Sequence, residues 1–189
     1  MTTYTIAVFV GSLRRDSINR RLLNAMIPMA PADFALRQIE IGGLPLYNQD
    51  DDDQQCDAVV AMKREIAAAQ GILFVTPEYN RSIPGVLKNA IDHASRPYGQ
   101  NSWHGKPAGI VGASTGGIGT ALAQQHLRNT LAYLEVPTMS QPEAYLQIAE
   151  GYFDEYGDFT NSDARRLLRG WMDEFATWVK LHNRPRDAG

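Results

Sequence analysis

The sequence predicts an α/β protein in which helices cover both faces of a parallel β-sheet. Apolar runs of strand length alternate with helical patterns along the chain, and this alternation is typical of strands joined by crossover helices. The run 71–76 (GILFVT) carries no charged residue, as expected for a central strand buried on both faces. A chain of 189 residues can build one substantial core, so we expect a single domain over residues 1–189.

Three strands are predicted in the first half of the chain. Residues 4–10 (YTIAVFV) are apolar and β-branched and form a buried strand. Residues 34–41 alternate apolar and polar side chains and form a half-buried strand near the sheet edge, a helix over roughly 56–69 follows, and residues 71–76 form the third strand. Ser17 is the expected N-cap of the helix after the first strand, and the apolar face of that helix contains Ile18, Leu22, Ala25, Met26 and Met29.

The second half begins with Pro84, which suits the first position of a helix over 84–95. Residues 106–114 form a fourth strand, residues 119–134 a helix, and residues near 136–140 a short fifth strand. A last helix follows an irregular stretch, and its helically spaced apolar positions are Leu167, Leu168, Trp171, Met172, Phe175, Trp178 and Val179.

About five strands favour a flavodoxin-like, three-layer arrangement over a six-stranded dinucleotide-binding fold. In open parallel sheets, ligands bind beyond the carboxyl ends of the strands, where the strand order reverses. For the flavodoxin-like order this point lies between the first and third strands. The candidate site therefore consists of the loops 11–19 and 77–84.

The first of these loops, GSLRRDSIN (11–19), has an excess of hydrogen-bond donors. The free N–H groups and dipole of the helix that it opens favour an anion. Ser12, Arg14, Ser17 and Asn19 can add side-chain donors. The loop lacks the Gly-Lys-Ser/Thr ending of a Walker loop. Local chemistry weighs a phosphate site about equally against a solvated loop in which Ser17 only caps the helix.

The second loop lies within TPEYNRSIPGVLKNAID (76–92), where two prolines stiffen the chain around Tyr79 and Asn80. These residues offer an aromatic face and amide donors to a flat heterocycle, and local packing of Tyr79 is the alternative. Arg81 is expected at the mouth of the site, where it either meets an anionic dinucleotide or faces solvent.

A third loop, VGASTGGIGTA (111–121), resembles the glycine-rich fingerprint of short-chain dehydrogenases. It follows the fourth predicted strand instead of the first, so the fingerprint interpretation fails. We interpret it as a loop that closely approaches a ligand, with Ser114 as a donor. A flexible turn is the alternative.

Composition argues against several classes of protein. The net charge of −3 gives no basic excess for nucleic acid or a membrane surface. The N-terminus lacks the features of a signal peptide, and Cys56 is the one cysteine, so we expect a cytoplasmic protein without disulfides. The four histidines show no metal-ligand spacing, and the acidic run 50–53 lacks the pattern of a calcium loop. We therefore expect no metal site.

These segments together resemble the NADPH-dependent FMN reductases, the family that includes bacterial chromate, quinone and azo-dye reductases. The resemblance rests on blocks that occur in the family order: GSLRRDSIN (11–19), LPLYNQD (44–50), TPEYNRSIPGVLKNAID (76–92), GKPAGIVGAS (105–114) and HLR (126–128). It implies a flavodoxin-like fold with noncovalently bound FMN, and a homodimer or homotetramer. Arg81 departs from the pattern, because some relatives carry an aromatic residue there.

The resemblance also implies the site. The FMN phosphate and ribityl chain are expected at Ser12, Arg14, Ser17, Ile18 and Asn19. The isoalloxazine ring is expected at Pro77, Glu78, Tyr79 and Asn80, with Ser114, Gly116 and Gly117 at another edge of the cofactor. Arg81 is a candidate substrate contact.

The implied reaction is ping-pong hydride transfer from NADPH or NADH to FMN and on to small-molecule electron acceptors. These acceptors are quinones, azo dyes, flavins or oxidised metal anions such as chromate. Because the flavin carries the chemistry, no protein residue is expected to be catalytic. The alternatives are a flavodoxin-type electron carrier that does not oxidise NAD(P)H, and a nucleotide-binding dehydrogenase without flavin.

Overall fold

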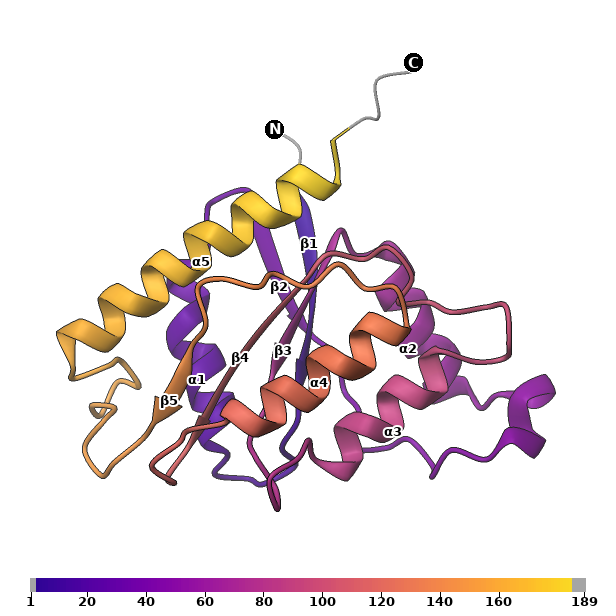
Figure 1. Cartoon of the computed structure of the whole chain (residues 1–189), viewed down its shortest axis with the longest axis horizontal. Coiled ribbons are helices and arrows are strands. Elements are labelled where there is room, and N and C mark those ends of the chain that lie inside the picture. The colour runs from indigo at the N-terminus through magenta and orange to yellow at the C-terminus, as the bar shows by residue number, and fades with distance from the viewer. Residues whose placement is uncertain (1–2, 185–189) are drawn as a thin grey trace.

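The structure, a computed structural model, describes residues 3–184, in which strands and helices alternate (Figure 1). The strands are β1 Tyr4–Val10, β2 Phe34–Gln38, β3 Gly71–Val75, β4 Ala108–Ser114 and β5 Tyr145–Gln147. The α-helices are α1 Ile18–Met26, α2 Asp57–Ala68, α3 Gly85–Ala94, α4 Ala121–Tyr133 and α5 Ser162–His182. Two 3₁₀ helices, Ile27–Met29 and Gln49–Gln54, lie between them.

The five strands form one parallel sheet in the order β2-β1-β3-β4-β5. This is the flavodoxin-like order. The strand β2 lies on one side of β1, whereas β3, β4 and β5 follow on the other side, so the order of the strands reverses between β1 and β3. The predicted α/β class, the five-stranded parallel sheet and the flavodoxin-like order are thus confirmed.

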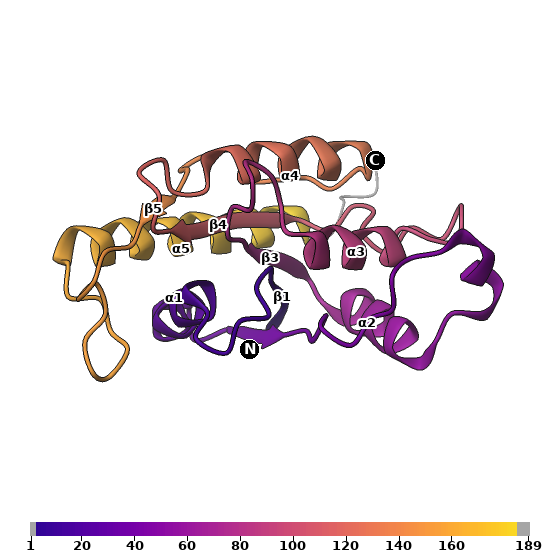
Figure 2. The same ribbon diagram turned by 90° about the horizontal axis from the view of Figure 1, so that it is seen from below.

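Two apolar layers enclose the sheet because successive side chains of a strand point to opposite faces. Ile6, Val8 and Val10 of β1 pack with α1 and α5, including the fully buried Trp171 and Phe175. Ala7 and Phe9 face the other layer, where α2, α3 and α4 pack. Figure 2 shows α1 and α4 on opposite sides of the strands. Burial on both faces explains why the central strands carry almost no polar residues.

The fifth strand lies later in the chain than predicted. Residues 136–140 form no strand; they touch the beginning of β4 through a single bridge between Ala108 and Thr138. Pro137 has no N–H group to donate to a ladder. The chain then leaves β4 and returns at Tyr145–Gln147, which pairs with the end of β4 from Gly112 to Ser114. The predicted short strand near 136–140 is therefore wrong in position, and β5 is Tyr145–Gln147.

The other boundaries differ by a few residues. The edge strand β2 ends at Gln38, whereas the predicted strand extends to residue 41. Ser17 caps α1 as predicted, because its hydroxyl oxygen accepts the Arg20 N–H at 3.2 Å. The loops after β1, β3 and β4 meet at the carboxyl edge of the sheet, at the bottom of Figure 1. The candidate site lies at this edge.

Candidate functional site

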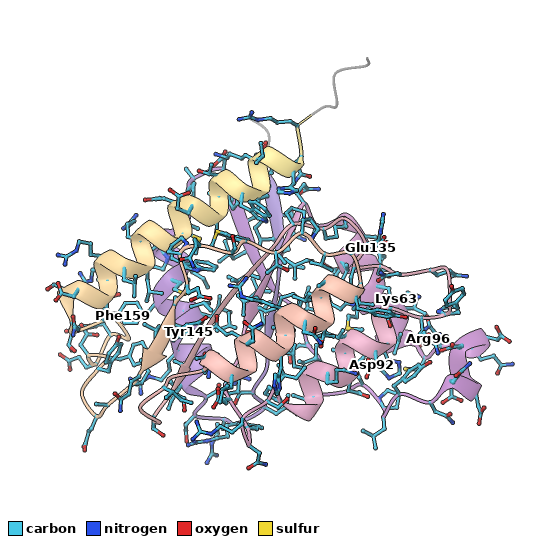
Figure 3. The ribbon with its side chains drawn as sticks, in the orientation of Figure 1. Lys63, Asp92, Arg96, Glu135, Tyr145 and Phe159 are labelled. Atoms are coloured by element: carbon cyan, nitrogen blue, oxygen red, sulfur yellow. The ribbon has the colours of Figure 1, made fainter. Side chains whose placement is uncertain are left out.

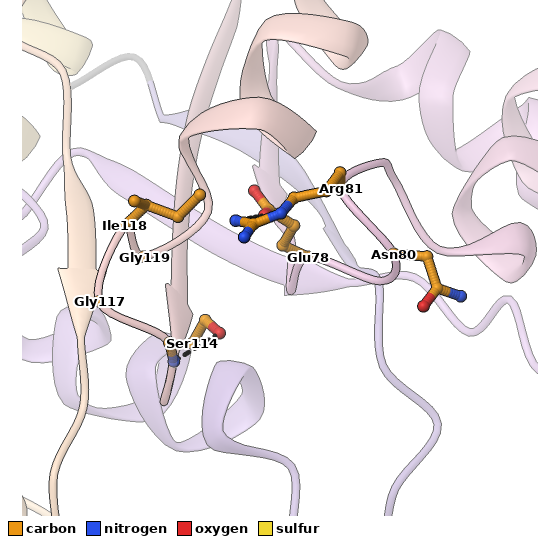
Figure 4. Close-up of a pocket in the computed structure, with 8 residues that line it drawn as sticks. Glu78, Asn80, Arg81, Ser114, Gly117, Ile118 and Gly119 are labelled. Carbon is orange, nitrogen blue, oxygen red and sulfur yellow. Dashed lines mark hydrogen bonds and ion pairs between the residues drawn. The ribbon is translucent and has the colours of Figure 1, made fainter.

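Two adjoining cavities lie at the carboxyl edge of the sheet. The smaller one, about 210 Å³, is lined by Ser12, Arg14, Ser17, Ile18, Asn19, Pro77, Glu78, Tyr79, Ala113, Ser114 and Thr115. The larger one, about 360 Å³, is lined by Glu78, Asn80, Arg81, Ser114, Gly116, Gly117, Ile118 and Gly119 (Figure 4). Glu78 and Ser114 line both cavities. Every residue predicted to bind a cofactor, and Arg81, lines one of the two, whereas Arg15 lines neither.

The loop after β1 has unused hydrogen-bond donors. Within residues 3–184, the backbone N–H groups of Ser12, Leu13 and Arg14 donate no hydrogen bond, and neither does the Ser12 hydroxyl. Ser12 is only 5% exposed, and buried polar groups normally have a partner. These donors lie beside the first turn of α1 and the side chain of Arg14. This donor set fits the phosphate of FMN.

The side chain of Asn19 forms a pair of hydrogen bonds within the protein. Its amide group donates to the Ala113 carbonyl at 2.8 Å, and its carbonyl accepts the Ala113 N–H at 2.9 Å. Asn19 is buried, so this pair of bonds ties α1 to the end of β4. Asn19 therefore lines the smaller cavity as a residue that holds two of its walls together.

The carboxylate of Glu78 joins the loop after β3 to helix α4. One oxygen accepts the backbone N–H groups of Leu122 at 3.0 Å and Ala123 at 3.1 Å, in the first turn of α4. The other oxygen lies 3.4 Å from the Arg81 guanidinium. The Glu78 side chain is 7% exposed, and the Thr120 side chain forms no capping bond. Glu78 thus caps α4 from outside the helix.

Residues 79–82 form a tight hairpin turn. Tyr79 and Ser82 exchange two backbone hydrogen bonds of 3.0 Å each. Asn80 and Arg81, the two central residues, both have positive φ, at 51° and 66°. The Ser82 hydroxyl also lies 3.0 Å from Nδ1 of His126, an exposed residue of α4. Contacts at Glu78 and Ser82 therefore hold this turn against α4.

Sequence reasoning missed four lining residues: Ala113, Thr115, Ile118 and Gly119. All lie in or beside the glycine-rich loop after β4, so its approach to a ligand was the available signal. Gly119 has a φ of +59°, and a Cβ atom there would meet the Tyr145 backbone at 2.8 Å. Burial and the neighbouring Glu143 carboxylate raise the pKa of Tyr145 to about 12, so its hydroxyl is neutral at physiological pH.

A second polar cluster lies away from these cavities, beside the acidic run 50–53 (Figure 3). Arg96 donates to the Tyr47 hydroxyl at 2.8 Å and lies 3.9 Å from the Asp52 carboxylate. The Lys63 ammonium donates to the Arg96 carbonyl, and burial lowers the pKa of Lys63. The acidic run 50–53 is therefore only partly solvated, because Asp52 is 14% exposed and paired.

Comparison with known proteins identifies relatives over nearly the full chain. The sequence profile of the family described as NADPH-dependent FMN reductase matches residues 4–151. A 2-hydroxy-1,4-benzoquinone reductase from Burkholderia sp. is 53% identical over 175 residues, which cover 93% of this chain and 96% of that protein. A quinone reductase from Pseudomonas putida is 47% identical over 180 residues, with coverage of 95% and 96%.

A solved structure agrees with these relatives. FerB, a flavoenzyme NAD(P)H:(acceptor) oxidoreductase from Paracoccus denitrificans, superimposes with a TM-score of 0.91 at 43% identity, and the match covers 95% of this chain and 99% of that one. Among the described residues, no helix is both long and apolar enough to cross a membrane. The family profile spans the three loops that build the two cavities, and with it the relatives establish that this chain belongs to the NADPH-dependent FMN reductase family.

Proposed function

We propose that this enzyme is a quinone reductase that holds FMN in the two adjoining cavities and uses NAD(P)H as the hydride donor. Family membership makes the chain an NAD(P)H-dependent FMN oxidoreductase. The quinone acceptor is proposed from the names of relatives that are 53% and 47% identical. The observation that carries the cofactor site is the set of unused donors from Ser12 to Arg14 beside the first turn of α1.

The assignment of residues follows the two cavities. The phosphate and ribityl chain of FMN take the smaller cavity, against Ser12, Arg14, Ser17 and Ile18. The isoalloxazine ring lies toward the larger cavity, along the walls that Pro77, Tyr79, Asn80, Ser114, Gly116 and Gly117 provide. Asn19 and Glu78 hold these walls in place.

The protein residues bind and orient. When bound, FMN supplies two-electron chemistry between the hydride donor and the acceptor. The Arg14 guanidinium and the N–H groups after β1 offset the charge of a phosphate. The Ser17 hydroxyl already accepts the Arg20 N–H, so its own hydrogen is free to donate to that phosphate. The half-exposed Tyr79 gives the cavity an aromatic wall.

A visible spectrum of the purified protein tests the proposal. We expect bound-flavin absorption that bleaches on anaerobic addition of NADPH or NADH and returns on addition of 1,4-benzoquinone. A flavodoxin-type electron carrier would bind FMN but would not bleach with either nucleotide. A protein that stays colourless after FMN is added would contradict both the quinone reductase and the electron carrier. That result would favour a nucleotide-binding dehydrogenase without flavin.

We also propose that the chain is a single FMN-binding domain that forms a homodimer or homotetramer in the cytoplasm. The support for an oligomer is a set of exposed apolar side chains on or beside α4, namely Ile118, Leu122, Tyr133 and Tyr145. Light scattering coupled to size-exclusion chromatography tests the oligomer, and a Leu122→Asp variant is expected to shift it toward the monomer. Cell fractionation tests the location, for which the single cysteine is the support.

A further inference from the structure

Arg81 occupies a backbone conformation that normally selects glycine. The turn 79–82 has positive φ at both central positions, which is the requirement of a type I′ hairpin turn. The favoured residues for these two positions are Asn and Gly, and this chain has Asn80 followed by Arg81. A long side chain with positive φ is strained by crowding of its Cβ atom. Strained residues of this kind cluster at functional sites, so the strain at Arg81 favours a functional role for its side chain.

The guanidinium of Arg81 is available to a solute. Its side chain is 68% exposed and lines the larger cavity, and Figure 4 shows it between Glu78 and the loop that carries Ile118 and Gly119. Its one ionic contact within residues 3–184 is the long, 3.4 Å pair with Glu78. Glu78 already accepts two N–H groups at the positive end of α4. A negative charge at this position therefore meets a net positive field.

We propose that Arg81 is a specificity-determining residue that favours ionised quinones, with hydroxyquinones as the substrate class. This proposal rests on the proposed quinone reductase function. A 2-hydroxy-1,4-benzoquinone is a vinylogous carboxylic acid, and at neutral pH its charge is shared between two ring oxygens. The oxygen on C2 shares this charge with the oxygen on C4 and lies next to the carbonyl oxygen on C1, so the guanidinium fork of Arg can donate to the adjacent pair of oxygens on C1 and C2. The charged acceptor also gains from the field at the cavity mouth during its approach.

The reaction balances with the reductant of this family. One hydroxyquinone anion takes a hydride from NAD(P)H, by way of the cofactor, and two protons from solvent. The products are one benzenetriol and one NAD(P)⁺. The electron pair enters the quinone ring, both quinone oxygens become phenols, and the ionised hydroxyl is neutralised. Reduction thus removes the negative charge, so Arg81 holds the oxidised acceptor more strongly than the reduced product.

The phosphates of NAD(P)H are a different source of negative charge. They lie beyond the nicotinamide ribose, remote from the reacting ring, whereas Arg81 lines the same cavity as Ser114 and Gly117, where the isoalloxazine ring is proposed to lie. The acceptor ring must contact that isoalloxazine ring to be reduced. This placement favours the acceptor as the partner of Arg81.

The test compares kcat/KM for 2-hydroxy-1,4-benzoquinone with kcat/KM for neutral 1,4-benzoquinone at pH 7, with NADH as the donor. In Arg81→Gln the ratio should fall by roughly ten-fold, as for loss of a charge-assisted contact, and Arg81→Lys should retain part of it. Added KCl should lower the ratio in the wild type but hardly change it in Arg81→Gln. Arg166→Gln is the matched control, because Arg166 forms an i,i+3 pair with Asp163 on α5, and its ratio should equal that of the wild type.

A second variant separates selectivity from folding. Arg81→Gly suits the positive φ better than Arg, so its melting temperature should rise while its preference for the anion falls. An unchanged ratio in Arg81→Gln and Arg81→Gly would overturn the proposal. The proposal would also be overturned if these variants raised the KM for NADPH but not the KM for NADH, while the ratio of kcat/KM values for the two quinones stayed unchanged. That result would assign Arg81 to the phosphate of the nucleotide. A wild-type protein that bleaches with NADH but reduces neither quinone would instead contradict the proposed function.

Discussion

The carboxylate of Glu78 accepts the backbone N–H of Leu122 at 3.0 Å, so the loop after β3 caps a helix that begins more than forty residues later in the sequence. Because Glu78 lines both cavities, the contact fixes the loop after β3 against the loop after β4. The walls of the candidate site are therefore held together by hydrogen bonds within the protein.

Replacement of Glu78 tests this contact. Glu78→Ala leaves the Leu122 and Ala123 N–H groups without their acceptor and should lower the free energy of unfolding by about 1–2 kcal/mol. Glu78→Gln keeps an acceptor oxygen and should lose less. Urea denaturation of the FMN-free protein measures both changes. Equal losses in the two variants would mean that the charge of Glu78, and not its acceptor oxygen, stabilises α4.

Asn19 and Arg14 line the same cavity but should respond differently to substitution. Asn19→Ala leaves the buried N–H and carbonyl of Ala113 without partners and should destabilise the FMN-free protein by about 1–3 kcal/mol. Arg14→Gln breaks no hydrogen bond or ion pair within residues 3–184, and should weaken FMN binding roughly ten-fold with little change in stability. Fluorescence titration with FMN and urea denaturation separate the effects, and a stable Asn19→Ala protein with weak FMN binding would reverse the assignment.

The fold could be predicted from sequence because its determinants are local. Ser17 has the side chain of an N-cap next to an apolar helical face, and β3 is an uninterrupted apolar run. The sequence pattern misplaced β5 for two reasons. Only three residues of β5 pair with β4, and the choice between residues 136–140 and Tyr145–Gln147 depends on which backbone groups of β4 are free to pair. Short strands are specified by their neighbours more than by their own sequence.

The site was predictable as a set of loops, whereas the roles of its side chains were not. The residues that line the two cavities lie at or after the ends of three neighbouring strands in a sheet of known strand order. The proximity of these residues to one another could therefore be inferred. That Asn19 bonds to Ala113 and Glu78 to Leu122 depends on contacts between segments remote in sequence. The strained turn at Arg81 was equally hidden, because the sequence Asn-Arg does not signal positive φ as Asn-Gly does.

Gly112 and Gly170 should respond in opposite directions to substitution by alanine. A Cβ atom at Gly112, in β4, would lie 2.1 Å from the Thr76 carbonyl oxygen and 2.5 Å from the Thr120 hydroxyl, so the backbone behind the site must shift. We expect a loss of about 1–3 kcal/mol in the free energy of unfolding. Gly170 is exposed within α5 with no atom near its Cβ position, so Gly170→Ala should gain about 0.5–1 kcal/mol. Thermal denaturation checks both, and a neutral Gly112→Ala would mean that β4 can relax.

The ion pair between Asp33 and Lys180, 2.8 Å long, should contribute a pH-dependent part of the stability. The hydrogen bond from Lys180 lowers the pKa of Asp33, so the stabilisation is complete above the unfolded pKa of about 3.9 and is lost as the pH falls through the folded value. Because both side chains are partly exposed, we expect at most about 0.5 kcal/mol. Asp33→Asn should remove this part, so the difference in unfolding free energy between wild type and variant should shrink between about pH 5 and pH 2. A constant difference would contradict the assignment.

Donor and acceptor should use the site in turn. The larger cavity is about 360 Å³, and small-molecule sites of about 300–1,000 Å³ enclose one drug-sized ligand. With the isoalloxazine ring against its wall, there is room for the nicotinamide or the quinone, but not for both. Initial rates measured with varied NADH at several fixed concentrations of 1,4-benzoquinone should therefore give parallel double-reciprocal lines, and NAD⁺ should compete with the quinone. Lines that intersect when NAD⁺ is removed enzymatically would show that both substrates bind together, and would require a second subsite beyond the two cavities.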